Sequence, residues 1–438
     1  MSIDNSKLFE TLESPIITKT YSIEEQTLNR CISIGQNKYE SSRNINVDSN
    51  ASQMELDDLW WIDYLKGFEE TTQSHKGFIR SVDLFCGPGG LSLGAKLAAN
   101  ALGYEFSSEL AVDINKDGLG IHQANHTPRY SELESVANLV NYKINKDDFG
   151  ARFEYEPTIT SSKILKLRGS IDLITAGPPC QGHSTFNNHT RFNDPRNLLY
   201  LTVPAMAVAL KVPAVVIENV PGVTASREGV VKTTIQLFLN SGYEVTFKVM
   251  NASSFGWPQN RKRFFLIATK GWEPLSLKTL ESSFNRPPRP VSWALNNALS
   301  NEESSIMTEI PEYSKVNMDR INFLHDNDID NLPNSERPDC HKGGNSYPSV
   351  YGRMRWDQPS PTLTTGFLSP GRGRYVHPNE RRTIVLREAA RIQGFPDNYI
   401  FSSTEKPIGR VAIAKAIGEA VPAPLGMIAV LSALANKK

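Results

Sequence analysis

The sequence contains little cysteine, with only four such residues in a chain of 438. They stand far apart, at Cys31, Cys86, Cys180 and Cys340, without a C-x-x-C pair or a neighbouring histidine cluster. This spacing argues against a disulfide framework and against a zinc site, so we expect no bound metal. The start of the chain lacks a basic segment followed by an apolar run, and no apolar stretch reaches the roughly 18 residues of a membrane span. We therefore expect a soluble, cytoplasmic protein without a membrane partner.

A net charge is also missing, because 47 basic residues balance 47 acidic ones. The charges are nevertheless segregated: residues 1–75 hold 6 Lys and Arg against 13 Asp and Glu, which leaves 41 basic and 34 acidic groups in the remainder. Eight arginines fall within 353–391, at Arg353, Arg355, Arg372, Arg374, Arg381, Arg382, Arg387 and Arg391. Such a cluster indicates a phosphate-binding surface, although arginines in structural ion pairs give the same pattern.

The first 75 residues differ in composition from the rest of the chain. Residues 1–54 are rich in Ser, Asn, Glu and Thr and show no sustained periodicity, so we expect an acidic extension that is partly disordered. Leu56, Trp60, Tyr64 and Phe68 then recur at helical spacing. They predict an amphipathic helix near 56–68 whose aromatic side chains pack on the following domain.

From residue 76 onward, short apolar strands alternate with helices. The expected strands cover 78–85, 107–114, 171–176, 214–219, 243–250 and 263–269. This alternation predicts an α/β protein with a doubly wound, Rossmann-like sheet over 76–270. The Pro-, Ser- and Asn-rich stretch that follows predicts a second, smaller domain over 271–383, and the helical patterns of 384–438 are expected to pack back on the first domain.

The first expected strand ends in a glycine-rich turn, "DLFCGPGGLSLG" at 83–94. Gly87, Gly89 and Gly90 allow the backbone to approach a ligand closely, and the following helix offers its N-terminal amides. The next strand ends at Asp113, about 25 residues later, where a carboxylate would meet the hydroxyls of a ribose. Together these features indicate an adenosyl cofactor or NAD, and the absence of Gly-Lys-Ser/Thr excludes a P-loop.

Three further chemical groups follow the ends of later strands. Cys180 lies in "TAGPPCQGHS", Glu218 in "IENV", and Arg261 and Arg263 in "PQNRKRFF". A free thiol with a pKa near 8.5 needs nearby positive charge to act as a nucleophile. Because ligands bind beyond the carboxyl ends of strands in such sheets, we expect these groups to share one cleft, where they suit attack on an electron-poor pyrimidine carbon.

The ordered motifs resemble those of C5-cytosine DNA methyltransferases from about residue 79 to 430. "DLFCGPGG" is similar to the family's S-adenosylmethionine loop, "GPPCQGHS" to its nucleophile loop, "ENV" to its acidic motif and "QNRKR" to its arginine motif. "LREAARIQGFP" and "AIGEAVPAPL" resemble the ninth and tenth blocks. The resemblance implies S-adenosylmethionine as cofactor, double-stranded DNA as partner, and a target-recognition domain in the second unit.

The resemblance also implies residue roles. Cys180 would add to C6 of a flipped-out cytosine, Glu218 would hold its N3 and Arg263 its O2, with Arg261 in the same catalytic group. Phe85 would lie against the adenine and Asp113 would bind the ribose. The cofactor-binding group implied in full is Asp83, Phe85, Gly87, Gly89, Gly90, Leu91, Asp113 and Pro178. The DNA-binding group is Gln181, Ser184, Arg353, Arg355, Arg372 and Arg374.

The loop 182–197 would close over the flipped base, and the protein would act as a monomer, with a restriction endonuclease that shares its site as a companion. Two positions depart from the family pattern: Glu419 replaces the usual Asn of the tenth block, and His183 stands where an apolar aromatic residue is usual. The acidity of the extension suggests a hypothesis, that it guards the DNA cleft or binds a partner.

Three other interpretations stay open from the sequence alone. A tRNA cytosine-5 methyltransferase would use the same motifs, although its Cys-Phe-Thr signature is absent. A catalytically silent DNA-binding module would follow if Glu419 disabled the cofactor site. A nucleotide-dependent oxidoreductase would bind NAD and would give Cys180 no role.

Overall fold

We describe the protein from a computed structural model. The described residues are 15–44, 54–72, 75–148, 150–179, 199–225, 229–296, 298–299, 305–342, 349–403 and 406–437. The predictions made for Cys180, Gln181, His183, Ser184 and the loop 182–197 lie outside these residues.

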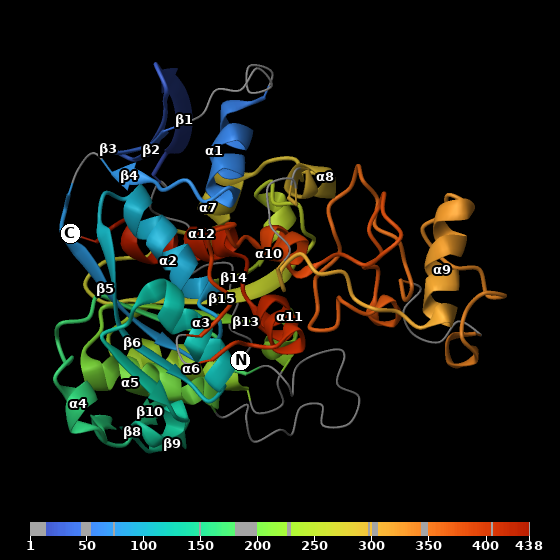
Figure 1. The fold of residues 1–438 in the computed structure, drawn as a ribbon. Helices are drawn as coiled ribbons and strands as arrows, with labels where there is room; N and C mark the ends of the chain where they lie inside the picture. The colour runs from blue at the N-terminus through green and yellow to red at the C-terminus, as the bar shows by residue number, and fades with distance from the viewer. Residues whose placement is uncertain are drawn as a thin grey trace.

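A seven-stranded sheet forms the centre of the molecule, in the order β14-β15-β13-β12-β5-β6-β7 (Figure 1). Its strands are β5 (Phe78–Leu84), β6 (Glu105–Asp113), β7 (Tyr130–Leu133), β12 (Leu173–Ala176), β13 (Ala214–Asn219), β14 (Glu244–Asn251) and β15 (Lys262–Thr269). Strands β7, β6, β5, β12 and β13 run parallel, whereas β15 runs antiparallel to both β13 and β14. The predicted Rossmann-like sheet is therefore confirmed, and the strand order reverses between β5 and β12, which is where such sheets bind ligands.

Helices cover both faces of the sheet, because the central strands are apolar on both sides. Along β13, Ala214 and Val216 face one core cluster, whereas Val215 and Ile217 face another. The first cluster contains α2 (Gly90–Ala101) and α12 (Ala423–Leu434), and the second contains α5 (Thr202–Leu210) and α6 (Val230–Asn240). Helix α3 (Lys116–His126) packs on β6 and β7.

A group of very short strands between residues 140 and 159 was not predicted. Strand β9 (Ile144–Asp147) pairs with β10 (Gly150–Phe153), and β8 (Val140–Asn141) pairs with β11 (Thr158–Ile159), both antiparallel. These strands have two to four residues each and are largely polar, so they carry too little alternation to be read from the sequence.

The prediction of partial disorder over 1–54 is wrong for residues 17–44. Strands β1 (Ile17–Glu24), β2 (Thr27–Ile34) and β3 (Asn37–Asn44) form an antiparallel sheet, which β4 (Thr71–Thr72) extends. Its inward positions include Arg30 and Arg43, which are 2% exposed and pair with Glu70. Because charged residues occupy core positions, the alternating burial was hidden from a search for apolar periodicity.

A helix does follow at the predicted place. Helix α1 (Leu56–Leu65) buries eight of its ten residues, but it ends before Phe68, which lies beyond the C-cap Lys66. The aromatic stripe predicted for this helix is therefore one residue shorter in the structure.

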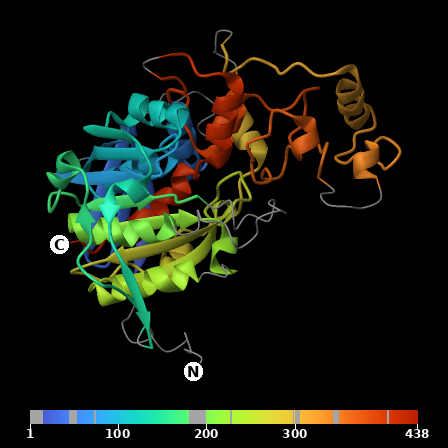
Figure 2. The same ribbon diagram turned by 90° about the horizontal axis from the view of Figure 1, so that it is seen from below.

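The chain leaves the central sheet through α7 (Leu277–Phe284) and α8 (Val291–Leu295), then forms α9 (Lys315–Asp326). Figures 1 and 2 show α9 and the loops around it extending away from the main body. These segments contain their own small core around Ile321, Leu324, Leu332 and Val376. Helix α7 instead packs against β1, β14 and α12, and the domain boundary near 271 stays a prediction.

The chain returns through α10 (Leu386–Gln393) and α11 (Arg410–Glu419) to α12. The stretch Arg410–Leu434 is long and apolar enough to cross a membrane by composition, but 94% of its apolar window is buried inside the protein. These residues therefore serve here as core helices.

Candidate active site

The ends of four neighbouring parallel strands bring the predicted groups to one edge of the sheet. The glycine loop follows β5, Asp113 ends β6, Pro178 follows β12 and Glu218 lies near the end of β13. Strand β15 runs in the opposite direction, so its beginning reaches the same edge, with Phe265 opposite Glu218. This arrangement brings Arg263 to the same edge of the sheet as Glu218.

Arg263 and Glu218 form a nearly buried ion pair. Nε of Arg263 lies 2.7 Å from Oε1 of Glu218, and the two side chains are 13% and 11% exposed. Burial raises the pKa of Glu218, while the positive charges of Arg263 and Arg261 oppose that rise. A carboxyl group in this setting holds a proton more readily than an exposed glutamate, which suits hydrogen bonding to a ring nitrogen.

The segment that leads into Cys180 passes beside this pair. The backbone N–H of Gly177 donates to the Leu84 carbonyl over 3.2 Å, and the Asn219 side-chain amide donates to the Pro178 carbonyl over 3.1 Å. A Cβ placed on Gly177 would lie 3.7 Å from Oε2 of Glu218 and 3.7 Å from the carbonyl oxygen of Phe85. The segment is therefore fixed between the acid and the glycine loop three residues before Cys180.

Arg261 is held differently from the role implied for it. Its guanidinium donates to the carbonyl of Leu363 over 2.7 Å and to that of Gly418 over 2.9 Å, and the residue is 1% exposed. These bonds tie the end of α11 to the segment around Leu363. The geometry gives Arg261 a positioning role, and its positive charge opposes the rise in the pKa of Glu218.

The glycine loop adopts left-handed backbone at three positions: Phe85, Gly87 and Gly89. The N–H of Gly87 donates to one oxygen of Asp113 over 2.7 Å, and the N–H of Asn115 donates to the other over 2.7 Å. Burial raises the pKa of Asp113, and these backbone hydrogen bonds oppose the rise. The loop and the acid are thus joined directly by hydrogen bonds, a contact that the sequence did not predict.

Asp83 does not join that unit. Its carboxylate is 2% exposed, accepts a hydrogen bond from the Ser92 hydroxyl over 2.6 Å and lies 3.6 Å from Nε2 of His122. These contacts fix the start of α2 from inside the protein, so Asp83 has a supporting role rather than contact with a ligand. Leu91 is also buried, with its side chain against Gly426 of α12.

Sequence reasoning missed two residues that support the loop from behind. The Tyr399 hydroxyl donates to the Pro88 carbonyl over 2.5 Å and lies 3.1 Å from Nε2 of His126. A Cβ on Gly89 would lie 2.6 Å from that same nitrogen, so only glycine fits there. Burial lowers the pKa of His126 well below its usual range, which keeps the ring neutral. Neither residue lies in a motif that would have marked it.

Glu419 lies close to the loop at the end of α11. The next residues pack on Gly90, where an added Cβ would lie 2.7 Å from the carbonyl oxygen of Val421. Partial loss of solvation raises the pKa of Glu419 although the residue is exposed; the positive charge of Lys415 lowers this pKa and the negative charge of Asp113 raises it. The departure at Glu419 therefore adds a second carboxylate near Asp113.

Three of the four arginines predicted to bind DNA are anchored to one acidic loop. Arg353 pairs with Asp328 at 2.6 Å, Arg355 pairs with Asp330, and Arg374 donates to the Asp330 carbonyl over 3.0 Å. The backbone N–H of Arg372 donates to the Ser369 carbonyl over 3.1 Å, but its exposed side chain makes no hydrogen bond or ion pair with another residue that the structure describes. Arg372 is thus the member of the group whose charge is most available.

The phosphate-surface interpretation is wrong for three other arginines of 353–391. Arg382, Arg387 and Arg391 are buried, and they bind Glu388 or Asp397. They hold α10 in place. Within the described residues, one group has metal-ligand chemistry, His377 with Glu380 and Glu388. Arg382 already donates to both of these carboxylates at 2.7 Å and supplies the positive charge there.

Comparisons with known proteins identify the family. Residues 79–431 match the family described as C-5 cytosine-specific DNA methylase. The type II methyltransferase M1.BsuMI of Bacillus subtilis (strain 168) is 40% identical over 368 residues, which cover 84% of this chain and 82% of the relative. The type II methylase M.HgiDII of Herpetosiphon aurantiacus is 29% identical over 354 residues, covering 79% and 92%.

Solved structures agree on the fold. The S. pombe Dnmt2 methyltransferase aligns with a TM-score of 0.53 at 17% identity, covering 82% of this chain and 98% of that one. The Entamoeba histolytica methyltransferase EhMeth aligns with a TM-score of 0.51 at 17% identity, covering 81% and 96%. With the family match over most of its length, the chain belongs to the C-5 cytosine-specific DNA methylases and is a DNA (cytosine-5)-methyltransferase.

Proposed function

We propose that the enzyme transfers a methyl group from S-adenosylmethionine to C5 of a cytosine flipped out of duplex DNA, through a covalent bond between Cys180 and C6. The observation that carries this proposal is the Glu218–Arg263 pair beside the segment leading to Cys180, next to the glycine loop. This chemistry requires three groups: an acid that can hold a proton, a fixed positive charge and a thiol. Glu218, Arg263 and Cys180 would supply them.

The residues around the loop fit S-adenosylmethionine. Phe85 is half-buried at the end of β5 and can pack on adenine, and the half-buried Asp113 can accept from ribose hydroxyls. Because the residue before α2 is Gly89, no side chain caps the first amides of that helix, which are suited to a carboxylate. When bound, this cofactor supplies the methyl group in electrophilic form.

The chain's own residues then prepare the cytosine. The Cys180 thiolate forms a bond to C6, and the electron pair displaced from the C5–C6 bond makes C5 nucleophilic. Glu218, sharing a proton with N3, and Arg263, near O2, stabilise the charge that develops on the ring. After C5 has taken the methyl group, a water molecule takes the proton from C5, the C5–C6 double bond re-forms, and Cys180 leaves C6 as the thiolate.

The target base has to leave the duplex, because its C5 and C6 atoms cannot be reached inside the base stack. Flipping costs about a few kcal/mol, which contacts to the base and to phosphates offset. We assign Arg353, Arg355 and Arg372 to the DNA face, with Gln181 and Ser184 as further DNA-binding residues, whereas Arg374 holds the 330–331 loop in place. Since the two relatives above are type II methyltransferases, we place the enzyme in a cytoplasmic restriction-modification system, as a monomer whose companion endonuclease shares its site.

The test is base-resolution sequencing of 5-methylcytosine in DNA from a methylation-free host that expresses the wild type, Cys180→Ala or the control Cys31→Ala. Cys31 lies on β2, outside the site. We expect one short methylated motif in the wild type and the control, and none in Cys180→Ala. Methylation that persists in Cys180→Ala contradicts the mechanism. An unmethylated genome with soluble wild-type protein, together with methylated tRNA from the same cells, contradicts the DNA substrate.

A further inference from the structure

The two domains meet at a junction formed by residues 256–260, 289–293, 356–360 and 392–394. The Ser360 N–H donates to the Pro258 carbonyl over 2.9 Å, and the Val291 N–H donates to the Gln358 carbonyl over 2.7 Å. The Trp257 indole N–H donates to the Ile392 carbonyl over 2.8 Å. These hydrogen bonds connect segments of the catalytic sheet to segments that lead to the recognition domain, and Arg261 and Arg263 follow directly after the first of the four.

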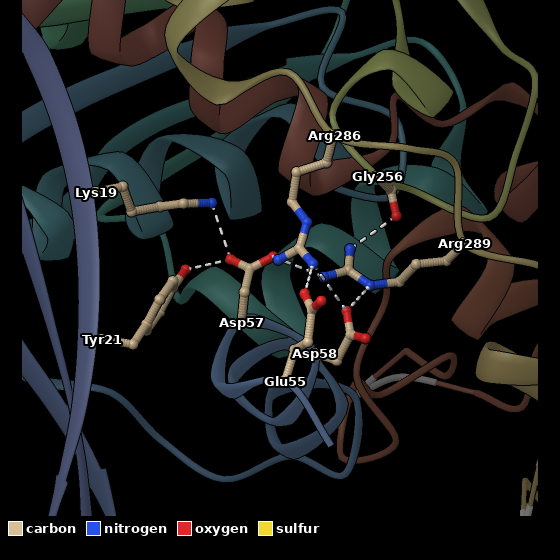
Figure 3. A network of polar contacts seen from close by, with 8 residues as sticks. All are labelled: Lys19, Tyr21, Glu55, Asp57, Asp58, Gly256, Arg286 and Arg289. Carbon is tan, nitrogen blue, oxygen red and sulfur yellow. Dashed lines mark hydrogen bonds and ion pairs between the residues drawn. The ribbon is translucent and has the colours of Figure 1, made fainter. Parts of the chain in front are cut away.

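The N-terminal elements pack onto this junction from outside. We call β1, β2, β3, β4 and α1 together the brace. Asp57 at the start of α1 accepts from Lys19 over 2.8 Å, from Tyr21 over 2.5 Å and from Arg289 over 2.7 Å, and it also pairs with Arg286. Figure 3 shows how these donors converge on one carboxylate from both the brace and the chain entering the junction.

Arg289 carries the contact into the junction itself. Its Nε donates to Asp58 over 2.6 Å, and its Nη1 donates to the Gly256 carbonyl over 2.7 Å, as seen in Figure 3. The residue is 6% exposed, and its guanidinium lies 4.7 Å from the ring centre of Trp293. The Arg289 side chain thus connects α1 of the brace to two junction segments, its own segment 289–293 and segment 256–260.

An aromatic row makes the same connection beside the polar network. Trp61 of α1 lies edge-on to Trp257 at 5.7 Å, and Trp257 lies edge-on to Trp293 at 5.5 Å. The Tyr64 hydroxyl donates to the Gly394 carbonyl over 2.7 Å, and the Asp397 N–H donates to the Leu65 carbonyl over 2.7 Å. The brace therefore contacts three of the four junction segments directly, and it is connected to the fourth, 356–360, through Val291.

The three acidic residues at the start of α1 are paired within this network. Glu55, Asp57 and Asp58 face Arg286 and Arg289, so this part of the extension's charge is neutralised within the chain. The hypothesis that the acidity guards a DNA cleft is wrong for these three residues. Among the described residues, no hydrogen bond or ion pair links the brace to a residue implied in cofactor or DNA contact.

We propose that the brace sets the angle between the catalytic and recognition domains, and that Asp57, Trp61 and Arg289 are positioning residues for DNA engagement. This inference rests on the proposed function for its DNA substrate. The reacting groups belong to one domain and the DNA-reading groups to the other, so only a narrow range of angles allows both to act on one duplex. A loosened junction lowers productive DNA binding while the glycine loop keeps its affinity for the cofactor.

The test compares Arg289→Gln and Arg289→Lys with the wild type and with Arg152→Gln, which removes an ordinary Arg–Asp pair on β10. Spin-labelled unnatural amino acids at Leu239 on α6 and Val316 on α9, which are 51% and 55% exposed, report the distance between the domains. We expect a narrow distance distribution in the wild type and Arg152→Gln, a broad one in Arg289→Gln and an intermediate one in Arg289→Lys. Arg286→Gln, at a half-buried position of the same network, replaces Arg289→Gln if that variant does not fold.

The functional arm measures kcat/KM for DNA and the cofactor affinity. We expect Arg289→Gln to lower kcat/KM for DNA about tenfold, which corresponds to about 1.4 kcal/mol, with cofactor affinity within twofold of the wild type. An unchanged distance distribution, or a fall in cofactor affinity parallel to the fall in activity, overturns the proposal. If the wild type methylates no DNA but Arg289→Gln still broadens the distances, the proposed function fails while the setting of the domain angle stands.

Discussion

Nε of Arg263 lies 2.7 Å from Oε1 of Glu218, where the beginning of β15 reaches the end of β13. The antiparallel direction of β15 is what brings an arginine to the edge where the parallel strands end. Burial favours the protonated form of the acid, and the guanidinium charge opposes that preference only in part, so the pKa of Glu218 is raised. A raised pKa favours the protonated carboxyl, which can donate to a ring nitrogen.

The first prediction concerns proton sharing by Glu218. Glu218→Gln keeps the shape of the side chain and its ability to donate a hydrogen bond, but it removes the titrating carboxyl. We expect methyl transfer in a single turnover to slow by about 100-fold to 10,000-fold, the range for loss of a general acid or base. Glu281→Gln, which breaks a 2.7 Å pair with Lys248 on the outer strand β14, is the matched control. Wild-type turnover by Glu218→Gln would exclude the proposed role.

The second prediction concerns the pH dependence of stability. Because the folded-state pKa of Glu218 is raised, its contribution to stability is complete below its unfolded pKa and is lost as pH rises through the folded value. Glu218→Gln has no such loss. The melting temperature of Glu218→Gln relative to the wild type should therefore increase from pH 4.5 towards pH 8. If the melting-temperature difference instead decreases from pH 4.5 to pH 8, the charge of Arg263 has a larger effect on the pKa of Glu218 than burial has.

A part of this protein can be predicted from the sequence when the residues that determine its structure are close together in the chain. Strands such as β12 and β13 are apolar on both faces, so their sequences alone mark them and place Pro178 and Glu218 at their ends. Arg30 sits inside the N-terminal sheet because Glu70 lies forty residues away to neutralise it. Asp83 belongs to a family motif, yet it turns inward to Ser92. The sequence pattern shows neither that Glu70 pairs with Arg30 nor that the Asp83 side chain points into the protein.

The third prediction tests the link between Asp113 and the glycine loop. Asp113→Asn leaves one oxygen where two accept the N–H groups of Gly87 and Asn115, and it places an amide where the proposed ribose hydroxyls donate. We expect the affinity for S-adenosylmethionine in calorimetric titration to fall at least about tenfold, or 1.4 kcal/mol. Asp319→Asn, an exposed acid on α9, serves as the control. Equal affinities in both variants would remove Asp113 from the cofactor site.

The fourth prediction concerns the second carboxylate near Asp113. S-adenosylmethionine carries a sulfonium charge that S-adenosylhomocysteine lacks, so the negative charge of Glu419 should favour the former. We expect Glu419→Gln to weaken S-adenosylmethionine binding about threefold to tenfold while changing S-adenosylhomocysteine binding less than twofold. Because Glu419 is accessible to solvent, the difference should shrink at high salt. Equal losses for both compounds would mean that Glu419 acts through loop shape instead of charge.

The fifth prediction separates two arginines that the sequence grouped together. The side chain of Arg372 is exposed without a described partner, whereas that of Arg374 donates to Asn331 over 2.6 Å and to the carbonyls of Asp330 and Arg353. Arg372→Ala should weaken DNA binding and reduce the slope of log affinity against log salt by about one, with the melting temperature unchanged. Arg374→Ala should instead lower the melting temperature, because three acceptors lose their donor.

Fluorescence titration of a duplex at several salt concentrations, beside thermal unfolding of both variants, measures these differences. Arg152→Ala is the control for loss of an exposed arginine, since Arg152 of β10 pairs with Asp147 at 2.7 Å and lies outside the 353–391 cluster. If Arg372→Ala changes which cytosines are methylated while leaving the salt slope intact, Arg372 contacts a base edge instead of a phosphate. If Arg374→Ala reduces the salt slope without any loss of stability, its bonds to the 330–331 loop are exchanged for phosphate when DNA binds, and the division drawn between the two arginines is wrong.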